Sequence, residues 1–260
     1  MKAYFDDYAA LLKRELLPAL GCTEPIAIAY AAALARECLP AFPERVVAAC
    51  SHDVIKNTMS VRVPMAEDLH GIEAAALMGL VGGDPARGME VLSAADARTC
   101  ARVRALLGTG FCRVEPLEAA EALAIRVTAF AGGHSAVAEI RGKHDHVARL
   151  ERDGVSLCRQ EEAREDARDE KPAYPPMDFE RIFAYVNEAD LSPVAPALER
   201  QIEYNLRIAE EGLKNPWGAR VGRTLLKCFG EDIENVARAY PAAGSDARMG
   251  GCVLPVVINS

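Results

Sequence analysis

A cysteine stands at the expected start of a helix in the stretch PALGCTEPIAIAYAAALA, residues 18–35. Cys22 follows Gly21. Thr23 suits the N-cap, and Pro25 suits the first turn, where a missing backbone N–H costs nothing. The unpaired N–H groups and the helix dipole favour an anion here, so we expect a lowered pKa for the Cys22 thiol. A thiolate at this place suits a metal site. The alternative is a small apolar residue packed at the helix start.

A second cysteine, Cys252, follows Gly250 and Gly251. Consecutive glycines permit a turn whose backbone N–H groups point inward and cradle a sulfide or carboxylate, although a simple turn before a terminal strand explains them equally well. The chain has eight cysteines, scattered and without a CxxC pair, which argues against a zinc ribbon or finger. In a reducing compartment most of them would be free thiols packed as small hydrophobic residues.

Polar residues gather in the segment SHDVIKN, between two expected strands. We expect a connecting loop, and loops are where site residues concentrate. Lys56 and Asn57 are the candidates for catalytic residues, because a lysine partly removed from water serves as a base or as an anchor for a carboxylate. Ser51 is a candidate for substrate binding. The alternative for Lys56 is a solvated lysine in a turn.

Histidines on a predicted hairpin suggest a different site. His144 and His146 flank Asp145, and their alternation places both on one strand face, as zinc would require. His134 lies at another hairpin tip. We favour an exposed hairpin edge, and we rank a zinc hydrolase built on these histidines below the other functions.

Helices and strands must position these residues. The apolar pattern of the sequence predicts an α+β fold, with helices packed on an antiparallel sheet and an all-helical region after it. Helices are predicted for Tyr4–Leu17, for Glu24–Cys38, for GIEAAALMGLVGG and for SAADARTCARVRALLGTG, the last with Ser93 as its N-cap. Strands are predicted for ERVVAACS and TMSVRVP, and for a meander of LAIRVTAFA, SAVAEIRG and HVARLERDG.

Three parts follow one another along the chain. Residues 1–158 form the predicted α+β domain, 159–177 a charged, proline-containing linker, and 178–260 a helical region. The final segment, CVLPVVINS, is apolar enough to need a packing partner. Either it docks on the first domain, or another polypeptide continues the structure.

Charge and hydropathy narrow the function classes. The net charge of −8 argues against a nucleic-acid partner, which would select a basic face. The sequence contains no run of about 18 apolar residues, so no transmembrane helix is predicted. The first residues, MKAYFDDYAALLKREL, lack the apolar core of a signal peptide, so we expect a cytoplasmic protein.

Four blocks of the sequence, in order across the whole chain, resemble the L-cysteine desulfidase family. They are PALGCTEP, CSHDVIKNTMSV, GKHDHVARLERDG and SDARMGGCVLPVVINS. This family was long catalogued as an uncharacterised group and is related to the iron–sulfur L-serine dehydratase alpha chain. The resemblance implies a cytoplasmic lyase that cleaves L-cysteine to pyruvate, ammonia and sulfide with a 4Fe-4S cluster held by three cysteines. Two of those metal ligands fall on Cys22 and Cys252.

The chain departs from the family in two places. Family members are longer and continue from the final NS with a Gly/Ser-rich loop, so the chain resembles their N-terminal portion. Residues 178–260 then correspond to the incomplete start of a cluster-binding domain, and Asn259 and Ser260 begin what resembles the substrate-binding loop. The third ligand would come from another cysteine here or from a second subunit. Residues 65–71 replace a glycine-rich continuation, so substrate contacts there are not carried over.

The implied reaction is an α,β-elimination, in which a base removes the α-proton and an open iron makes sulfide a better leaving group. One alternative is an L-serine dehydratase alpha-type subunit acting on L-serine. Another is a non-catalytic truncated module that binds a partner. The expected partners are a small amino-acid substrate, a second chain supplying the C-terminal half, and a second copy of the chain in a homodimer. Neither nucleic acid nor membrane is expected.

Overall fold

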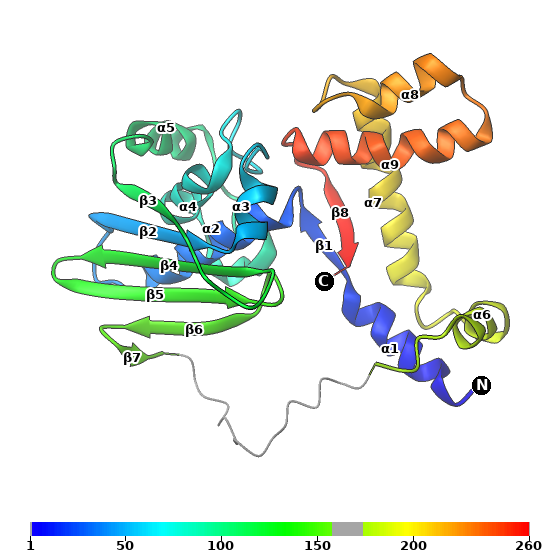
Figure 1. Ribbon diagram of the computed structural model, residues 1–260, viewed down its shortest axis with the longest axis horizontal. Coiled ribbons are helices and arrows are strands. Elements are labelled where there is room, and N and C mark those ends of the chain that lie inside the picture. Colours follow the sequence, from blue (N-terminus) through cyan, green and yellow to red (C-terminus); the bar gives the residue numbers. More distant parts are fainter. Residues whose placement is uncertain (1, 158–173, 260) are drawn as a thin grey trace.

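The described residues of the computed structural model, 2–157 and 174–259, form a sheet packed with helices and a smaller helical part (Figure 1). The α+β class and the helical region after it are therefore confirmed. Most of the predicted linker, together with Cys158 and Ser260, lies outside the described residues. Within the described ranges, no helix is long and apolar enough to cross a membrane.

Six strands form the main sheet, in the order β3-β2-β4-β5-β6-β7. They are β2 (Arg45–Cys50), β3 (Cys112–Pro116), β4 (Ala124–Ala131), β5 (His134–Arg141), β6 (Val147–Arg152) and β7 (Val155–Ser156). The predicted antiparallel meander is confirmed as β4, β5 and β6. The prediction missed β3, where only the first of five residues is buried and the apolar pattern is weak. Because β3 runs parallel to β2, the sheet is mixed and not purely antiparallel.

Two helices rich in alanine, α2 (Thr23–Glu37) and α4 (Gly71–Gly82), fill the core and pack against each other and the sheet. Their closest approach depends on Gly79. A Cβ atom at this position would lie 2.0 Å from the carbonyl oxygen of Ala29, which no side chain tolerates. Small residues therefore bring the axes together, and this packing holds the start of α2 in place.

Several local predictions in the first part are wrong. Residues predicted as a connecting loop form a short helix, α3 (His52–Thr58), and TMSVRVP contributes only an isolated bridge between Arg62 and His70 instead of a strand. A 3-10 turn, η2 (Pro85–Glu90), precedes α5 (Ala97–Leu106). The N-cap of α5 is Asp96 and not Ser93, because Asp96 forms a reciprocal capping box with the third residue of the helix.

The helical part contains α6 (Phe179–Glu188), α7 (Ala195–Lys214), α8 (Val221–Phe229) and α9 (Ile233–Met249). The helix α9 was not predicted, because Pro241 lies inside it and interrupts the pattern. It packs closely on α7, where a Cβ on Gly212 would lie 2.0 Å from the carbonyl oxygen of Ala243. The C-terminal end of α9 points toward the start of α2 (Figure 1).

Segments from the two ends of the chain pair in a second, two-stranded sheet. The strand β1 (Leu16–Leu20) pairs antiparallel with β8 (Pro255–Asn259), which also contacts α7. Before β1 come η1 (Lys2–Tyr4) and α1 (Phe5–Glu15), so the predicted first helix ends earlier than expected. The apolar terminal segment thus packs on β1 and α7. Residues 2–20 lie with the helical part, although the prediction placed them in the same domain as the sheet.

Candidate functional site

A cavity of about 310 Å³ brings together three of the predicted site residues, Cys22, Lys56 and Asn57. They come from the start of α2 and from α3, and the end of α9 closes the cavity with Arg248. Its volume is at the lower end of the range for small-molecule sites, about 300–1,000 Å³. The site therefore spans the two parts of the fold.

Gly21 positions Cys22 in this cavity. Its φ of +61° lies in the left-handed region, and a Cβ atom would lie 2.7 Å from Cγ of Pro64. The same Cβ position is 3.8 Å from the carbonyl oxygen of Cys252, so the two cysteine-bearing segments lie side by side. Cys22 itself is the N-cap of α2, and the prediction that Thr23 takes this role is wrong, because the helix already begins at Thr23.

The Cys22 thiol is buried, and this burial raises its pKa. The positive charge of Arg248 acts in the opposite direction, and Glu24 adds to the increase. The prediction of a lowered pKa is therefore wrong for the metal-free chain. Removal of the sulfur from water outweighs the positive charge of Arg248.

Glu24 organises the polar side of the cavity. Its carboxylate accepts a hydrogen bond from Nδ2 of Asn57 at 3.0 Å and another from Oγ1 of Thr23 at 3.2 Å. An acidic residue in the first turn of α2 is also favoured by the helix dipole. Asn57 is thus held in place by Glu24, and Lys56 precedes it on α3 in the wall of the same cavity.

His144 is half-buried, and its burial lowers the pKa of its imidazole, while Glu24 and Asp145 act in the opposite direction. Its neighbour in the predicted zinc pair, His146, has Nδ1 3.0 Å from the carbonyl oxygen of Arg141. His134 pairs with Asp153, with Nδ1 and Oδ2 2.7 Å apart. The described contacts of His146 and His134 therefore belong to the hairpins around β5.

Arg248 is the site residue that the sequence analysis missed. Its Nε is buried and has no hydrogen-bond partner among the described residues. A buried donor without a partner costs about 1–3 kcal/mol, so an anionic group in the cavity would relieve this cost. The residue lies inside the SDARMGGC block, which was the available signal, although the predicted site residue in that block was Cys252.

Cys252 does not line this cavity. It is buried in a small apolar cluster with Ile208, Ala247 and Val256. Burial raises the pKa of its thiol, and hydrogen bonds from the backbone N–H groups of the two following residues oppose that increase. The N–H groups near this sulfur are therefore those after the cysteine, and not those of the glycines before it.

The residues present do not complete an iron–sulfur site. In the part of the chain that the structure describes, no three or more His, Cys, Asp or Glu side chains are grouped to hold a metal ion. Cys22 and Cys252 lie on adjacent segments, but two thiolates are one fewer than the resemblance requires. The remaining described cysteines do not supply the third ligand.

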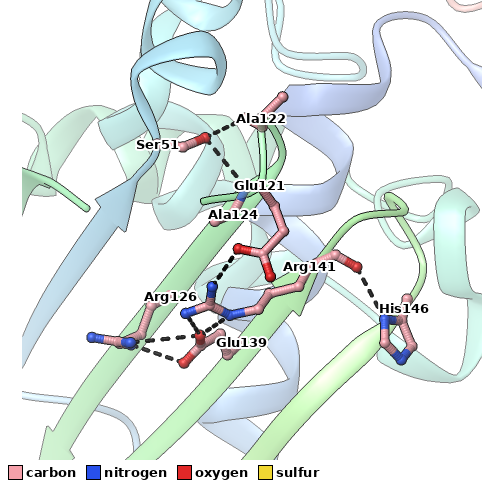
Figure 2. A network of polar contacts seen from close by, with 8 residues as sticks. All are labelled: Ser51, Glu121, Ala122, Ala124, Arg126, Glu139, Arg141 and His146. Carbon is pink, nitrogen blue, oxygen red and sulfur yellow. Dashed lines mark hydrogen bonds and ion pairs between the residues drawn. The ribbon is translucent and has the colours of Figure 1, made fainter. Parts of the chain in front are cut away.

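Ser51 lines a different cavity from Cys22, Lys56 and Asn57, and its own contacts are drawn in Figure 2. Its hydroxyl donates to the carbonyl oxygen of Ala122 at 2.6 Å and accepts from the backbone N–H of Ala124 at 3.2 Å. These bonds fasten the end of β2 to the start of β4, and the residue lines a separate cavity of about 350 Å³. Asn259 is paired through its backbone with Leu16, and Ser260 lies outside the described residues.

A buried carboxylate, Glu139 on β5, lies at the centre of the other contacts drawn in Figure 2. Its Oε2 is 2.9 Å from Nε of Arg126, and it also pairs with Arg141, which in turn contacts Glu121 at 2.8 Å. Burial raises the pKa of Glu139, but the hydrogen bonds and charges of the two arginines outweigh burial and hold it below the usual value. This network stabilises the sheet next to Ser51.

The fold and the cavity define an α+β protein in which a thiol, an amine and a guanidinium share one small space. Its known relatives are longer. The UPF0597 protein of Lachnoclostridium phytofermentans is 48% identical over 250 residues, which covers 96% of this chain and 60% of the relative. The UPF0597 proteins of Finegoldia magna and Treponema denticola are 38% and 34% identical, over 98% and 100% of this chain and 60% and 61% of theirs.

The chain is therefore homologous to UPF0597 proteins and spans about three fifths of the length of the curated relatives it matches. Their shared name states no activity and mentions neither cysteine desulfidase nor serine dehydratase. No family model matches the chain. No solved structure matches it either.

Proposed function

We propose that this chain is the amino-acid-binding portion of an iron–sulfur-dependent lyase that cleaves L-cysteine to pyruvate, ammonia and sulfide. The supporting observation is the shared cavity of Cys22, Lys56, Asn57 and Arg248. The reaction type comes from the resemblance to the L-cysteine desulfidase family. Both the GCTEP and the ARMGGC block contribute side chains to this one cavity.

The charged groups of the cavity suit an amino acid. The guanidinium of Arg248 matches a carboxylate, and its unpartnered Nε supplies a free donor for it. The carboxylate of Glu24 would receive the substrate ammonium, with its orientation held by Asn57. Lys56 would then remove the α-proton as the base.

The elimination accounts for every bond that is broken and formed. The electron pair of the broken Cα–H bond forms the Cα–Cβ double bond, and the Cβ–S bond breaks with its electrons leaving on sulfur. The aminoacrylate that remains takes up one water molecule and yields pyruvate and ammonia. Carboxylate binding and proton removal use only residues of this chain.

The 4Fe-4S cluster would need a thiolate beyond the described residues. We propose Cys22 and Cys252 as two of its ligands and place the third in a second chain that supplies the C-terminal half. We also propose a cytoplasmic location, because a reducing compartment keeps thiols free, as they are at Cys22, Cys50, Cys100, Cys112, Cys228 and Cys252.

Amino-acid binding is tested on the chain as it is, by calorimetric titration in reducing, anaerobic buffer. We expect L-cysteine and L-serine to bind, and cysteamine, which lacks the carboxylate, to bind at least tenfold more weakly. Arg248→Gln should weaken L-cysteine binding at least tenfold. Arg238→Gln, an exposed arginine on the same helix, should not change it. Equal effects of the two substitutions would contradict the assignment of Arg248.

Catalysis is tested after anaerobic co-expression with the remaining region of the Lachnoclostridium phytofermentans relative. The complex should contain iron and acid-labile sulfide and should release sulfide and pyruvate from L-cysteine. Cys22→Ser should abolish iron loading, whereas Cys228→Ser, which changes an exposed thiol, should not. A colourless, iron-free complex without sulfide release would refute the lyase. Faster turnover of L-serine would reassign the substrate.

A further inference from the structure

An apolar groove of about 510 Å³ lies between α7, α9 and β8, on the helical part. Ile202 and Leu206 form one wall and remain 59% and 47% exposed, while Val256 and Val257 lie on the side of β8. The groove is preformed. Asn205 accepts a hydrogen bond from the N–H of Val257 at 3.1 Å and donates to its carbonyl oxygen at 3.3 Å, which fixes β8 to α7.

Exposed apolar side chains concentrate on this part of the molecule. Twelve of the sixteen large hydrophobic residues that are exposed lie within residues 174–259, although this range is much shorter than 2–157. On α6, next to the near end of α7, Phe179 is 80% exposed and stacks on Phe183 with ring centroids 5.8 Å apart. Exposed apolar side chains concentrated on one part of a molecule are typical of an interaction site.

The relatives indicate what covers this surface. This chain accounts for about three fifths of their length, so about two fifths of each relative lies outside the matched sequence. The groove offers apolar walls on two helices, which is the arrangement that receives the apolar face of an amphipathic helix.

We propose that the groove between α7, α9 and β8 is the docking site for an amphipathic helix from the two fifths of the relatives that lie outside the match with this chain. Ser245 and Arg248 line both this groove and the Cys22 cavity. Docking therefore covers one side of the cavity and removes water from it. The apolar walls of the groove make this contact, so it is tested separately from the lyase chemistry.

The first test is co-purification from cells that express the chain with the remaining region of the Lachnoclostridium phytofermentans relative, with the affinity tag on that region. The unmodified chain should co-purify in equal amounts. The double substitution Ile202→Glu and Leu206→Glu should reduce recovery at least tenfold. Val155→Glu, at a 65% exposed position on β7, should leave recovery unchanged. Equal recovery of all three chains would overturn the proposal.

A second test avoids any need for the added region to fold as a separate chain. The chain is fused to that region in a Cys228→Ser background, and a cysteine is placed at Leu206 or, as the control, at Val155. Maleimide labelling of Leu206→Cys should be at least tenfold slower in the fusion than in the chain alone, and labelling of Val155→Cys should be equal in both. Unchanged labelling at Leu206 would overturn the proposal. So would light scattering that shows a homodimer of the chain alone, lost in the double variant.

Titration of L-cysteine in the same samples separates the two proposals. Co-purification without amino-acid binding would support the docking site and contradict the proposed function. Amino-acid binding by a chain that does not retain the added region would support the proposed function and contradict the docking site.

Discussion

Replacement of Gly21 by alanine tests how the cysteine segment is held at the cavity. The left-handed backbone at φ +61° costs an alanine about 1–2 kcal/mol. The new Cβ would also lie 2.7 Å from Cγ of Pro64, closer than real Cβ atoms come to other heavy atoms, so one of the two segments must shift. Forcing an atom into such a contact costs about 1–3 kcal/mol. We therefore expect Gly21→Ala to lower the free energy of unfolding by about 2–5 kcal/mol.

Gly132→Ala is the matched control. This glycine has a similar φ of +55°, but nothing lies within 4 Å of the Cβ position. Its substitution carries the backbone cost and the same reduction in unfolded-chain entropy, without the steric contact. The difference between the two variants should therefore equal the contact with Pro64, about 1–3 kcal/mol.

Urea unfolding followed by far-UV circular dichroism and by the fluorescence of Trp217, the single tryptophan, measures both variants. Trp217 packs in the apolar cluster that contains Cys252, so its signal reports on the region next to Gly21. If the two alanine variants lose the same stability, the close contact with Pro64 does not position Cys22 and the reasoning fails.

Two further predictions concern the sheet. Glu139→Gln should lower the free energy of unfolding by roughly 1.5–3 kcal/mol at pH 7, because it removes charged hydrogen bonds from a buried carboxylate. Since the arginines hold the pKa of Glu139 below its usual value, this loss should be constant above about pH 5 and shrink as the pH falls below about 4. A loss that stays constant down to pH 3 in urea titrations would contradict the ion pairing. Burial raises the pKa of Cys50 and Cys112 to about 12. In the folded protein at pH 8 both should therefore react with a thiol reagent at least a hundredfold more slowly than exposed Cys228, and at the same rate in urea. Mass spectrometry of labelled peptides measures this, and early labelling of either buried thiol in the folded chain would show that its site opens.

Much of the local structure was predictable because it depends on short-range patterns. The alternation of apolar residues in β4 and β5 and the alanine-rich stretch of α2 are each carried by neighbouring residues. The wrong local predictions have a common cause, which is a weak apolar pattern in the segment concerned. In α3, a segment of polar appearance became helical, and in β3 a strand with a single buried residue left almost no apolar signal.

The site was predictable only in part. The sequence pointed to Cys22, Lys56 and Asn57, and the structure places all three in one cavity. It did not point to Arg248, because the missing partner of its Nε is visible only once the end of α9 lies beside the start of α2 in the cavity. Ser51 was a candidate because of its hydroxyl, but that hydroxyl bonds the backbone of Ala122 and Ala124 and fixes the start of β4.

The sequence by itself determined that a thiol stands at the start of a helix, with a glycine before it. Tertiary structure alone decided how deeply that thiol is buried and in which direction its pKa moves. The helix end favours a thiolate, whereas burial removes the sulfur from water and raises the pKa of Cys22. The pairing of β1 with β8 joins segments more than two hundred residues apart, and no local pattern encodes which strand a short apolar segment selects. That pairing and the packing of α9 complete the cavity.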